Sequence, residues 1–175
     1  MKKPDNIYLV ELIGIFGIIA SLLFVGAQLV LDRNIAYSTA FHDRSALLVE
    51  NSTGMRDNYE YVQQRARALE KSKPSWWNSD IELYVAQNEL SMEDVVRLNI
   101  QASIYLQITD NNYYQYELGL IDEATWEGLR TGFSGNLRYP ISKARIVGAM
   151  YLRPSMKKMV EELVAEIEES TPAGT

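Results

Sequence analysis

Cysteine is absent from this 175-residue chain, and histidine occurs once, as His42. Without cysteine there can be no disulfide, no thiolate nucleophile and no cysteine-ligated zinc or iron–sulfur site. A single histidine also excludes a multi-histidine metal site and most catalytic triads. The sequence has no glycine-rich phosphate-binding loop and no set of carboxylates at metal-ligand spacing. We therefore predict no catalytic residue, no cofactor and no metal.

Positive charge is also in deficit, because 17 Lys and Arg face 23 Asp and Glu and give a net charge of −6. An acidic balance of this kind argues against nucleic acid as a partner. No stretch alternates apolar and polar residues with a period of two, so we expect no β-strands. A hydrophobic content of 47% is too high for a disordered chain. These features together predict a folded, all-α protein.

One long hydrophobic run is present near the N-terminus. Glu11 precedes it, and no ionisable residue occurs between Leu12 and Leu31. About 20 apolar residues are what a helix needs to cross the hydrocarbon core of a bilayer. We predict a membrane anchor at residues 1–33, a helical soluble domain at 34–170 and a disordered tail at 171–175. The protein should then be a single-pass protein of a bacterial inner (plasma) membrane.

Three other interpretations fit this run less well. A cleaved secretory signal has an apolar region of only about 7 to 15 residues. A buried core helix is usually shorter and has a polar face. A pilin-like subunit is a further alternative, because Glu11 is the fifth residue of an apolar run after a short basic leader. Pilin leaders, however, end in glycine where this chain has Asn6, and pilin heads are built largely on a β-sheet.

Apolar residues recur at intervals of three and four through the rest of the chain, which predicts helices. Glycine should end two of them: Gly54 a first helix over residues 7–51, and Gly119 a helix that starts at Ser91. We predict an N-terminal transmembrane helix that continues into a soluble helical bundle of about five to six helices. Further helices are expected at 55–71, 80–90, 123–135, 141–152 and 155–169.

The apolar faces of these helices define a predicted core. Their side chains should meet between the helices, because only a buried apolar stripe stabilises an amphipathic helix in water. The predicted core contains Phe41, Leu48, Tyr59, Val62, Leu98, Tyr105, Leu106, Trp126, Leu129, Phe133, Ile146 and Leu163.

Two blocks carry a resemblance to other proteins. The first is Ala20–Gln28 (ASLLFVGAQ), followed by Ile35 and Ala36, and the second is Gln115–Glu123 (QYELGLIDE), followed by Trp126. In both blocks the chain resembles a large set of uncharacterised bacterial proteins with one N-terminal transmembrane helix and a helical soluble domain. The resemblance implies the same architecture over nearly the whole chain, and it implies no activity and no site residue.

The numbers of basic residues before and after the apolar run hardly indicate on which side of the membrane the domain lies. Lys2 and Lys3 precede the apolar run, whereas Arg33 and Arg44 follow it. The positive-inside rule therefore gives almost no preference. The resemblance and the basic segment described next favour a cytoplasmic domain slightly.

Seven basic residues and no acidic residue occur between residues 128 and 160. Beside a membrane such a segment could bind anionic headgroups, at about 1 kcal/mol for each base near the surface. Alternatively, the bases pair with acids elsewhere in the domain, which is the usual state of surface charge. The candidate headgroup contacts are Arg130, Arg138, Lys143, Arg145, Arg153, Lys157 and Lys158.

The apolar run has one face of small and polar residues. On a helical wheel Gly14, Gly17, Ser21 and Gln28 fall within about 60° of one another, and Glu11 lies next to Gly14. Small residues let a second helix approach closely, and Gln28 could hydrogen-bond across the contact. These five residues are the candidate helix–helix interface. Alternatively, glycine and serine are simply common in spans, and Glu11 lies at the headgroups.

The sequence thus predicts a membrane-anchored helical interaction or accessory protein. Its partners would be the lipid bilayer and either another membrane protein or a second copy of the chain. A membrane-bound hydrolase or lipid-modifying enzyme that uses carboxylates is the alternative from another class. The missing cysteine and the single histidine favour the interaction protein, since catalytic bases are most often histidine.

Overall fold

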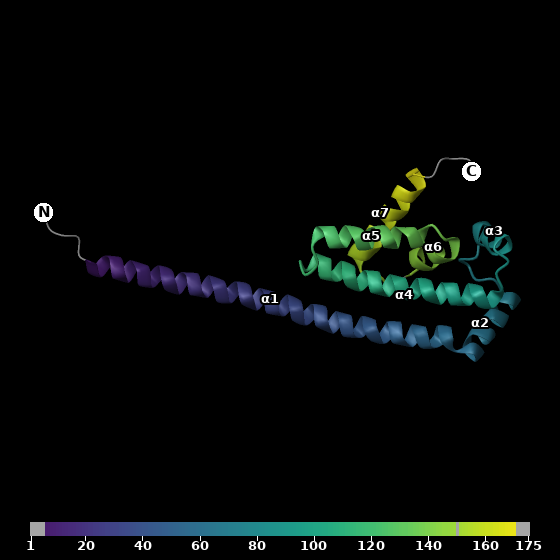
Figure 1. Cartoon of the computed structure of the whole chain (residues 1–175), viewed down its shortest axis with the longest axis horizontal. Helices are drawn as coiled ribbons and strands as arrows, with labels where there is room; N and C mark the ends of the chain where they lie inside the picture. The colour runs from purple at the N-terminus through teal and green to yellow at the C-terminus, as the bar shows by residue number, and fades with distance from the viewer. Residues whose placement is uncertain (1–5, 150, 171–175) are drawn as a thin grey trace. The chain divides into compact units, whose positions relative to one another are not determined.

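The computed structural model describes residues 6–149 and 151–170, and helices make up most of them (Figure 1). No strand occurs in this described part of the chain, so the prediction of an all-α fold is confirmed. The predicted tail at 171–175 lies outside the described residues. In chain order the helices are α1 (Asn6–Asp57), α2 (Tyr59–Lys71), α3 (Ser79–Gln87), α4 (Met92–Glu117), α5 (Glu123–Leu137), α6 (Pro140–Val147) and α7 (Pro154–Ser170).

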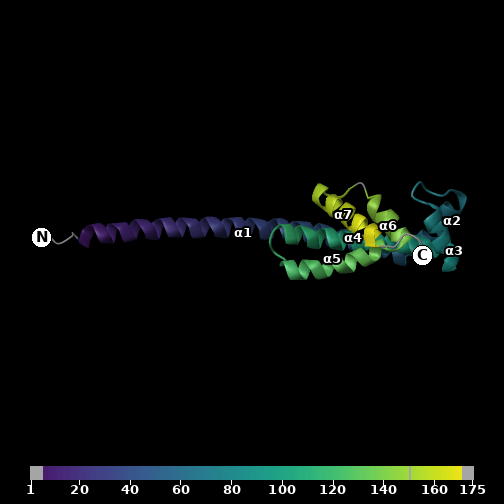
Figure 2. The ribbon, with the colours of Figure 1, turned by 90° about the horizontal axis from the view of Figure 1, so that it is seen from above.

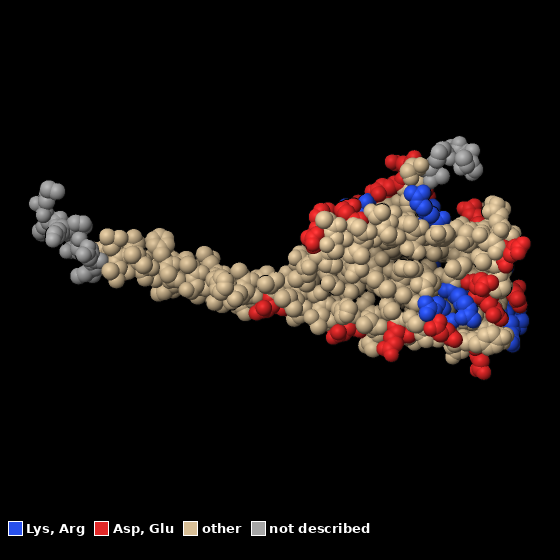
Figure 3. All heavy atoms as spheres, in the orientation of Figure 1, with Lys and Arg blue, Asp and Glu red and all other residues tan. Residues whose placement is uncertain are grey.

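The chain divides into two compact units, residues 1–40 and 41–175, with the boundary inside α1. In the first unit α1 is long and apolar enough to cross a membrane. Its side chains from Tyr8 to Leu31 are exposed, and Figure 3 shows this stretch as a surface with almost no charge. The predicted boundary between the membrane anchor and the soluble domain, at 33/34, was set by the end of the apolar run. It stays a prediction, because it concerns where the chain leaves the membrane.

The predicted end of the first helix at Gly54 is wrong, because α1 continues to Asp57. The amide of Asn58 still donates to the Gly54 carbonyl oxygen at 3.0 Å, so helical bonding passes through the glycine. Glycine inside a helix costs only about 1 kcal/mol relative to alanine. The break occurs where Asn58 caps α2, with its side chain accepting a bond from the Tyr61 amide at 2.9 Å.

Helix α4 is the centre of the second unit and contacts α2, α5 and α6. In both Figure 1 and Figure 2 α4 and α5 run side by side in opposite directions. The predicted stop at Gly119 is confirmed. Its φ of 73° is a conformation that glycine adopts without strain. The Leu120 amide then donates to the Gln115 carbonyl oxygen at 2.9 Å, which closes the helix end.

The N-terminus of α4 is closed by a reciprocal cap. The Asp94 amide donates to Ser91 Oγ at 3.1 Å, and the Ser91 amide donates to Asp94 Oδ2 at 2.9 Å. The Ser91 hydroxyl also donates to Asp94 Oδ2, at 2.6 Å. This bond and that from the Ser91 amide hold the pKa of Asp94 below its usual range, since both favour the charged carboxylate. The predicted helix start at Ser91 is therefore confirmed.

We expect Ser91→Ala to lower the free energy of unfolding by about 1 kcal/mol, the usual value of such a cap. Because the folded pKa of Asp94 is lowered, its contribution is complete above the unfolded value of about 3.9 and is lost as pH falls through the folded value. Urea titrations followed by circular dichroism at pH 7 and pH 2.5 would measure this. An equal loss at both pH values would contradict the role of the Asp94 carboxylate.

The largest core cluster joins α4, α5, α6 and α7 around Leu106, Trp126, Phe133 and Leu163. Six of the predicted core residues are buried: Val62, Leu106, Trp126, Phe133, Ile146 and Leu163. Phe41 and Leu98 are half-buried. Four others are exposed, so their assignment to the core was wrong: Leu48, Tyr59, Tyr105 and Leu129. Apolar spacing marks a helix face, but only the neighbouring helix decides how much of that face is covered.

Candidate functional site

The small-residue face of α1 is open. A Cβ atom built on Gly14 or on Gly17 would meet no atom within 4 Å. Ser21 Oγ donates to the Gly17 carbonyl oxygen at 2.8 Å, so this hydroxyl is satisfied within its own helix. Glu11 and Gln28 are exposed on the same helix. A second helix could therefore approach this face closely, and the predicted interface stays a prediction.

The seven basic residues between 128 and 160 are mostly paired with acids. Four of them meet glutamates of α7: Arg130 bonds Glu166 at 2.5 Å, Lys143 bonds Glu168 at 2.7 Å, and Lys157 and Lys158 reach Glu161 and Glu162 at 3.9 and 3.6 Å. Arg153 pairs with Asp110 and Glu117. Arg145 bonds a serine, and Arg138 forms no ion pair with a described residue. The glutamates of α7 thus neutralise much of the segment, and headgroup binding stays a prediction.

Arg153, the residue before α7, is the centre of a polar cluster in the second unit. Its Nη2 and Nε donate to Asp110 Oδ1 at 2.8 and 3.0 Å, and its Nη1 donates to Glu117. The guanidinium also lies 4.7 Å from the centre of the Tyr114 ring and 5.4 Å from that of Phe41. Both the charge and the plane of the arginine are therefore held by neighbours from α1 and α4.

Burial sets the protonation of this cluster. It raises the pKa of Asp110 above the usual range, by more than the positive charge of Arg153 lowers it. Burial alone would lower the pKa of Arg153, but the hydrogen bonds to Glu117 and Asp110 outweigh burial and raise the pKa. Arg153 is thus firmly cationic, and Asp110 is the carboxylate whose charge burial opposes.

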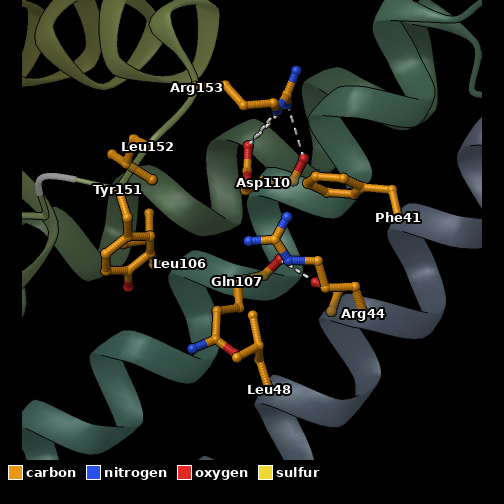
Figure 4. Close-up of a pocket in the computed structure, with 10 residues that line it drawn as sticks. Phe41, Arg44, Leu48, Leu106, Gln107, Asp110, Tyr151, Leu152 and Arg153 are labelled. Carbon is orange, nitrogen blue, oxygen red and sulfur yellow. Dashed lines mark hydrogen bonds and ion pairs between the residues drawn. The ribbon is translucent and has the colours of Figure 1, made fainter.

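A cavity of about 100 Å³ lies beside the Arg153 cluster (Figure 4). Its walls include Phe41, Arg44, Leu106 and Tyr151, and Asp110 is the carboxylate that lines it. A hydrolase of the alternative class would need two inward-facing carboxylates to act as acid and base. Among the described residues of its wall Asp110 is the one carboxylate, and it is held by Arg153.

The sequence did not reveal this cluster. Arg153 was grouped with the basic segment, whereas its partner Asp110 lies 43 positions earlier in the chain. One signal was available, since Asp110 and Glu117 stand seven positions apart on the same predicted helix and share a face. Nothing local, however, indicates which base would lie opposite them.

We expect Arg153→Leu to lower the free energy of unfolding by about 2 kcal/mol. Removing one partner of a fully buried pair costs about 3 to 5 kcal/mol, and the partial exposure of Arg153 and Asp110 reduces this value. The double variant R153L/D110N should recover part of the loss, because the more buried of the two carboxylates that Arg153 pairs with is then uncharged. Urea unfolding of the full chain in detergent would measure both. A double variant less stable than R153L would contradict the assigned pairing.

Neither unit shows a metal site among the described residues, where no group of three or more histidine or acidic side chains could hold an ion. The chain matches no protein-family model, no curated protein and no solved structure.

Proposed function

We propose that this protein is a single-pass membrane protein of a bacterial inner membrane. In this proposal its helical domain is an interaction or accessory module. The observation that supports the proposal is the apolar part of α1, whose side chains from Tyr8 to Leu31 are exposed and therefore belong to no core. Exposing such a surface to water would be highly unfavourable, whereas lipid tails or another helix would cover it.

A cleaved signal sequence near the N-terminus would satisfy the same criteria of length and apolarity. The two possibilities differ in the mass of the mature chain. An anchored chain retains residues 1–33 in the membrane fraction, whereas a cleaved chain loses them. Intact-mass measurement on the membrane-bound and soluble fractions decides between them, and a truncated chain in the soluble fraction would contradict the proposal.

We place the domain on the cytoplasmic side, on the basis of the resemblance and the basic segment. A C-terminal fluorescent reporter that matures only in the cytoplasm should be active, and a C-terminal phosphatase that folds only outside it should be inactive. The opposite pattern would reverse the topology and leave the anchor itself untouched.

The proposed partner of the span is another membrane protein or a second copy of the chain, bound at Glu11, Gly14, Gly17, Ser21 and Gln28. Close packing at small residues is the main source of helix association in lipid, because apolar burial does not favour association there. The position of Gly14, Gly17 and Ser21 on one exposed face of α1 supports this proposal. For the enzyme alternative, no second carboxylate lines the Asp110 cavity among the described residues. For the pilin-like alternative, the described residues contain no strand of the kind that a pilin head is built on.

We expect Gly17→Leu to weaken association in the membrane severalfold, since the larger side chain holds a second helix away. Gly26→Leu is the matched control, because Gly26 lies about 180° from Gly17 at 100° per residue and is equally open. Gln28→Leu should have a smaller effect, since hydrogen bonds within membranes contribute only about 0.6 kcal/mol on average. In-membrane cross-linking is the measurement. Equal loss in the Gly17 and Gly26 variants would reject the assigned face, and no loss in either would make the span a plain anchor.

A further inference from the structure

A second cavity of the helical domain has a volume of about 220 Å³. It lies between the C-terminal end of α1 and helices α2, α4 and α6. Polar and apolar side chains meet there. Arginines come from α2 and α6, as Arg65 and Arg145, and Ser103 comes from α4. An apolar wall contains Leu69 and Trp76. The cavity lies wholly within residues 41–175, so its walls belong to one compact unit.

The charge of this cavity is unbalanced. Arg65 and Arg145 both line it, and no aspartate or glutamate is among the described residues of its wall. Neither arginine forms an ion pair with a described residue, whereas Arg56, Arg130 and Arg153 each do. Arg145 is half-buried and Arg65 is exposed at the cavity wall, and no described carboxylate of that wall competes with an anion for them.

Arg145 is also held in position. Its Nε donates to Ser103 Oγ at 2.6 Å, and this hydroxyl donates to the Asn99 carbonyl oxygen at 3.1 Å. Ser103 thus uses its acceptor on the arginine and its donor on the α4 backbone. The two terminal nitrogens of Arg145 have no hydrogen-bond partner among the described residues and retain their donors for a ligand.

We propose that this cavity binds a small organic phosphate or carboxylate. A guanidinium group presents parallel N–H donors that match two oxygens of either anion. The anionic group would lie on Arg65 and Arg145, and an apolar or aromatic part of the ligand would pack against Leu69 and Trp76. The volume lies below the roughly 300 to 1,000 Å³ of common drug-sized sites, which favours a ligand of about one ring. This inference is independent of the partner proposed for the span.

Calorimetric titration of the full-length chain in a non-ionic detergent tests the proposal. The probes are phenyl phosphate, benzoate, inorganic phosphate and phenol. We expect phenyl phosphate or benzoate to bind more tightly than inorganic phosphate, which lacks the apolar part, and phenol to show no binding. Binding should also weaken with added salt, because the attraction is partly screened. No heat from either aromatic anion, or equal binding of phenol, would overturn the proposal.

Single substitutions locate the site. Arg65→Gln and Arg145→Gln should each weaken binding of the better aromatic probe by roughly tenfold or more, the loss of one charge-assisted pair. Arg67→Gln is the matched control. Arg67 is exposed on α2, as Arg65 is, but lies outside this cavity, and its substitution removes the same charge. Ser103→Ala should weaken binding less than Arg145→Gln does, since it removes only the hydrogen bond that positions Arg145 and leaves the guanidinium in place.

Folding of each variant is checked by thermal unfolding. A variant that fails to fold is replaced by its lysine counterpart, Arg65→Lys or Arg145→Lys, which keeps the charge and loses the parallel donors. The lysine variants should still bind more weakly than the wild type. Unchanged affinity in both arginine variants, or an equal loss in Arg67→Gln, would contradict the assigned site.

Discussion

Two arginines placed in the apolar run, Ile18→Arg with Leu22→Arg, should release the full-length chain from the membrane. Each arginine at the centre of a transmembrane helix costs about 2.5 to 3.5 kcal/mol on insertion scales, so the pair costs roughly 5 to 7 kcal/mol. Both residues are exposed on α1, so neither substitution disturbs a protein core. The wild-type chain should stay in the pellet after alkaline carbonate washing, and the double variant should move to the supernatant.

Leu47→Arg with Asn51→Arg is the matched control for this experiment. These residues have the same spacing on α1, are also exposed and lie beyond the apolar run. The control variant should remain in the pellet. Flotation on a density gradient separates membrane-bound protein from aggregate. Wild-type chain in the soluble fraction, or a double variant that still floats with the membrane, would contradict the anchor.

The largest expected loss of stability in the helical domain comes from Trp126→Ala. Trp126 is 3% exposed in the core between α4 and α5. Its ring lies 4.9 Å from that of Tyr113 and 5.4 Å from that of Tyr116, measured between centres. A cavity left by a large aromatic side chain costs about 3 to 5 kcal/mol. We therefore expect the free energy of unfolding to fall by at least about 3 kcal/mol.

Leu129→Ala is the control for Trp126→Ala, because it lies one turn further along α5 and is 37% exposed. It should lower the free energy of unfolding by only about 1 kcal/mol, since much of its surface already contacts water. Urea unfolding of the full chain, followed by far-ultraviolet circular dichroism, measures both variants. Similar losses for the two would mean that Trp126 does not hold α5 on the core.

Local patterns predicted the helices well wherever a residue acts on its own neighbours. Ser91 caps α4 and Gly119 ends it, since a cap bond and a positive φ need only the adjacent backbone. Gly54 was misjudged for the same reason. A glycine permits a helix end without requiring one, and Asn58 provided a stronger local alternative.

Local sequence patterns could not predict which charged residues pair with one another. The spacing of Asp110 and Glu117 places them on one face of α4, but the chain must fold before Arg153 lies between them. In the same way Arg65 and Arg145 stand 80 positions apart and line one cavity only because α2 and α6 both pack on α4. An ion pair or a cavity depends on the relative position of two helices, which no single helix encodes.

The sequence by itself determined the uncharged run from Leu12 to Leu31, the helical class of the domain and several helix ends. These three features follow from composition and from contacts between residues about four positions apart or less. Each segment makes such contacts by itself, without packing against another helix. The tertiary structure alone decided which apolar faces are covered, and that α7 neutralises much of the basic segment. It also decided that two arginines line one cavity whose described walls contain no acid. These depend on contacts between distant segments, because burial and charge pairing are properties of the packed helices.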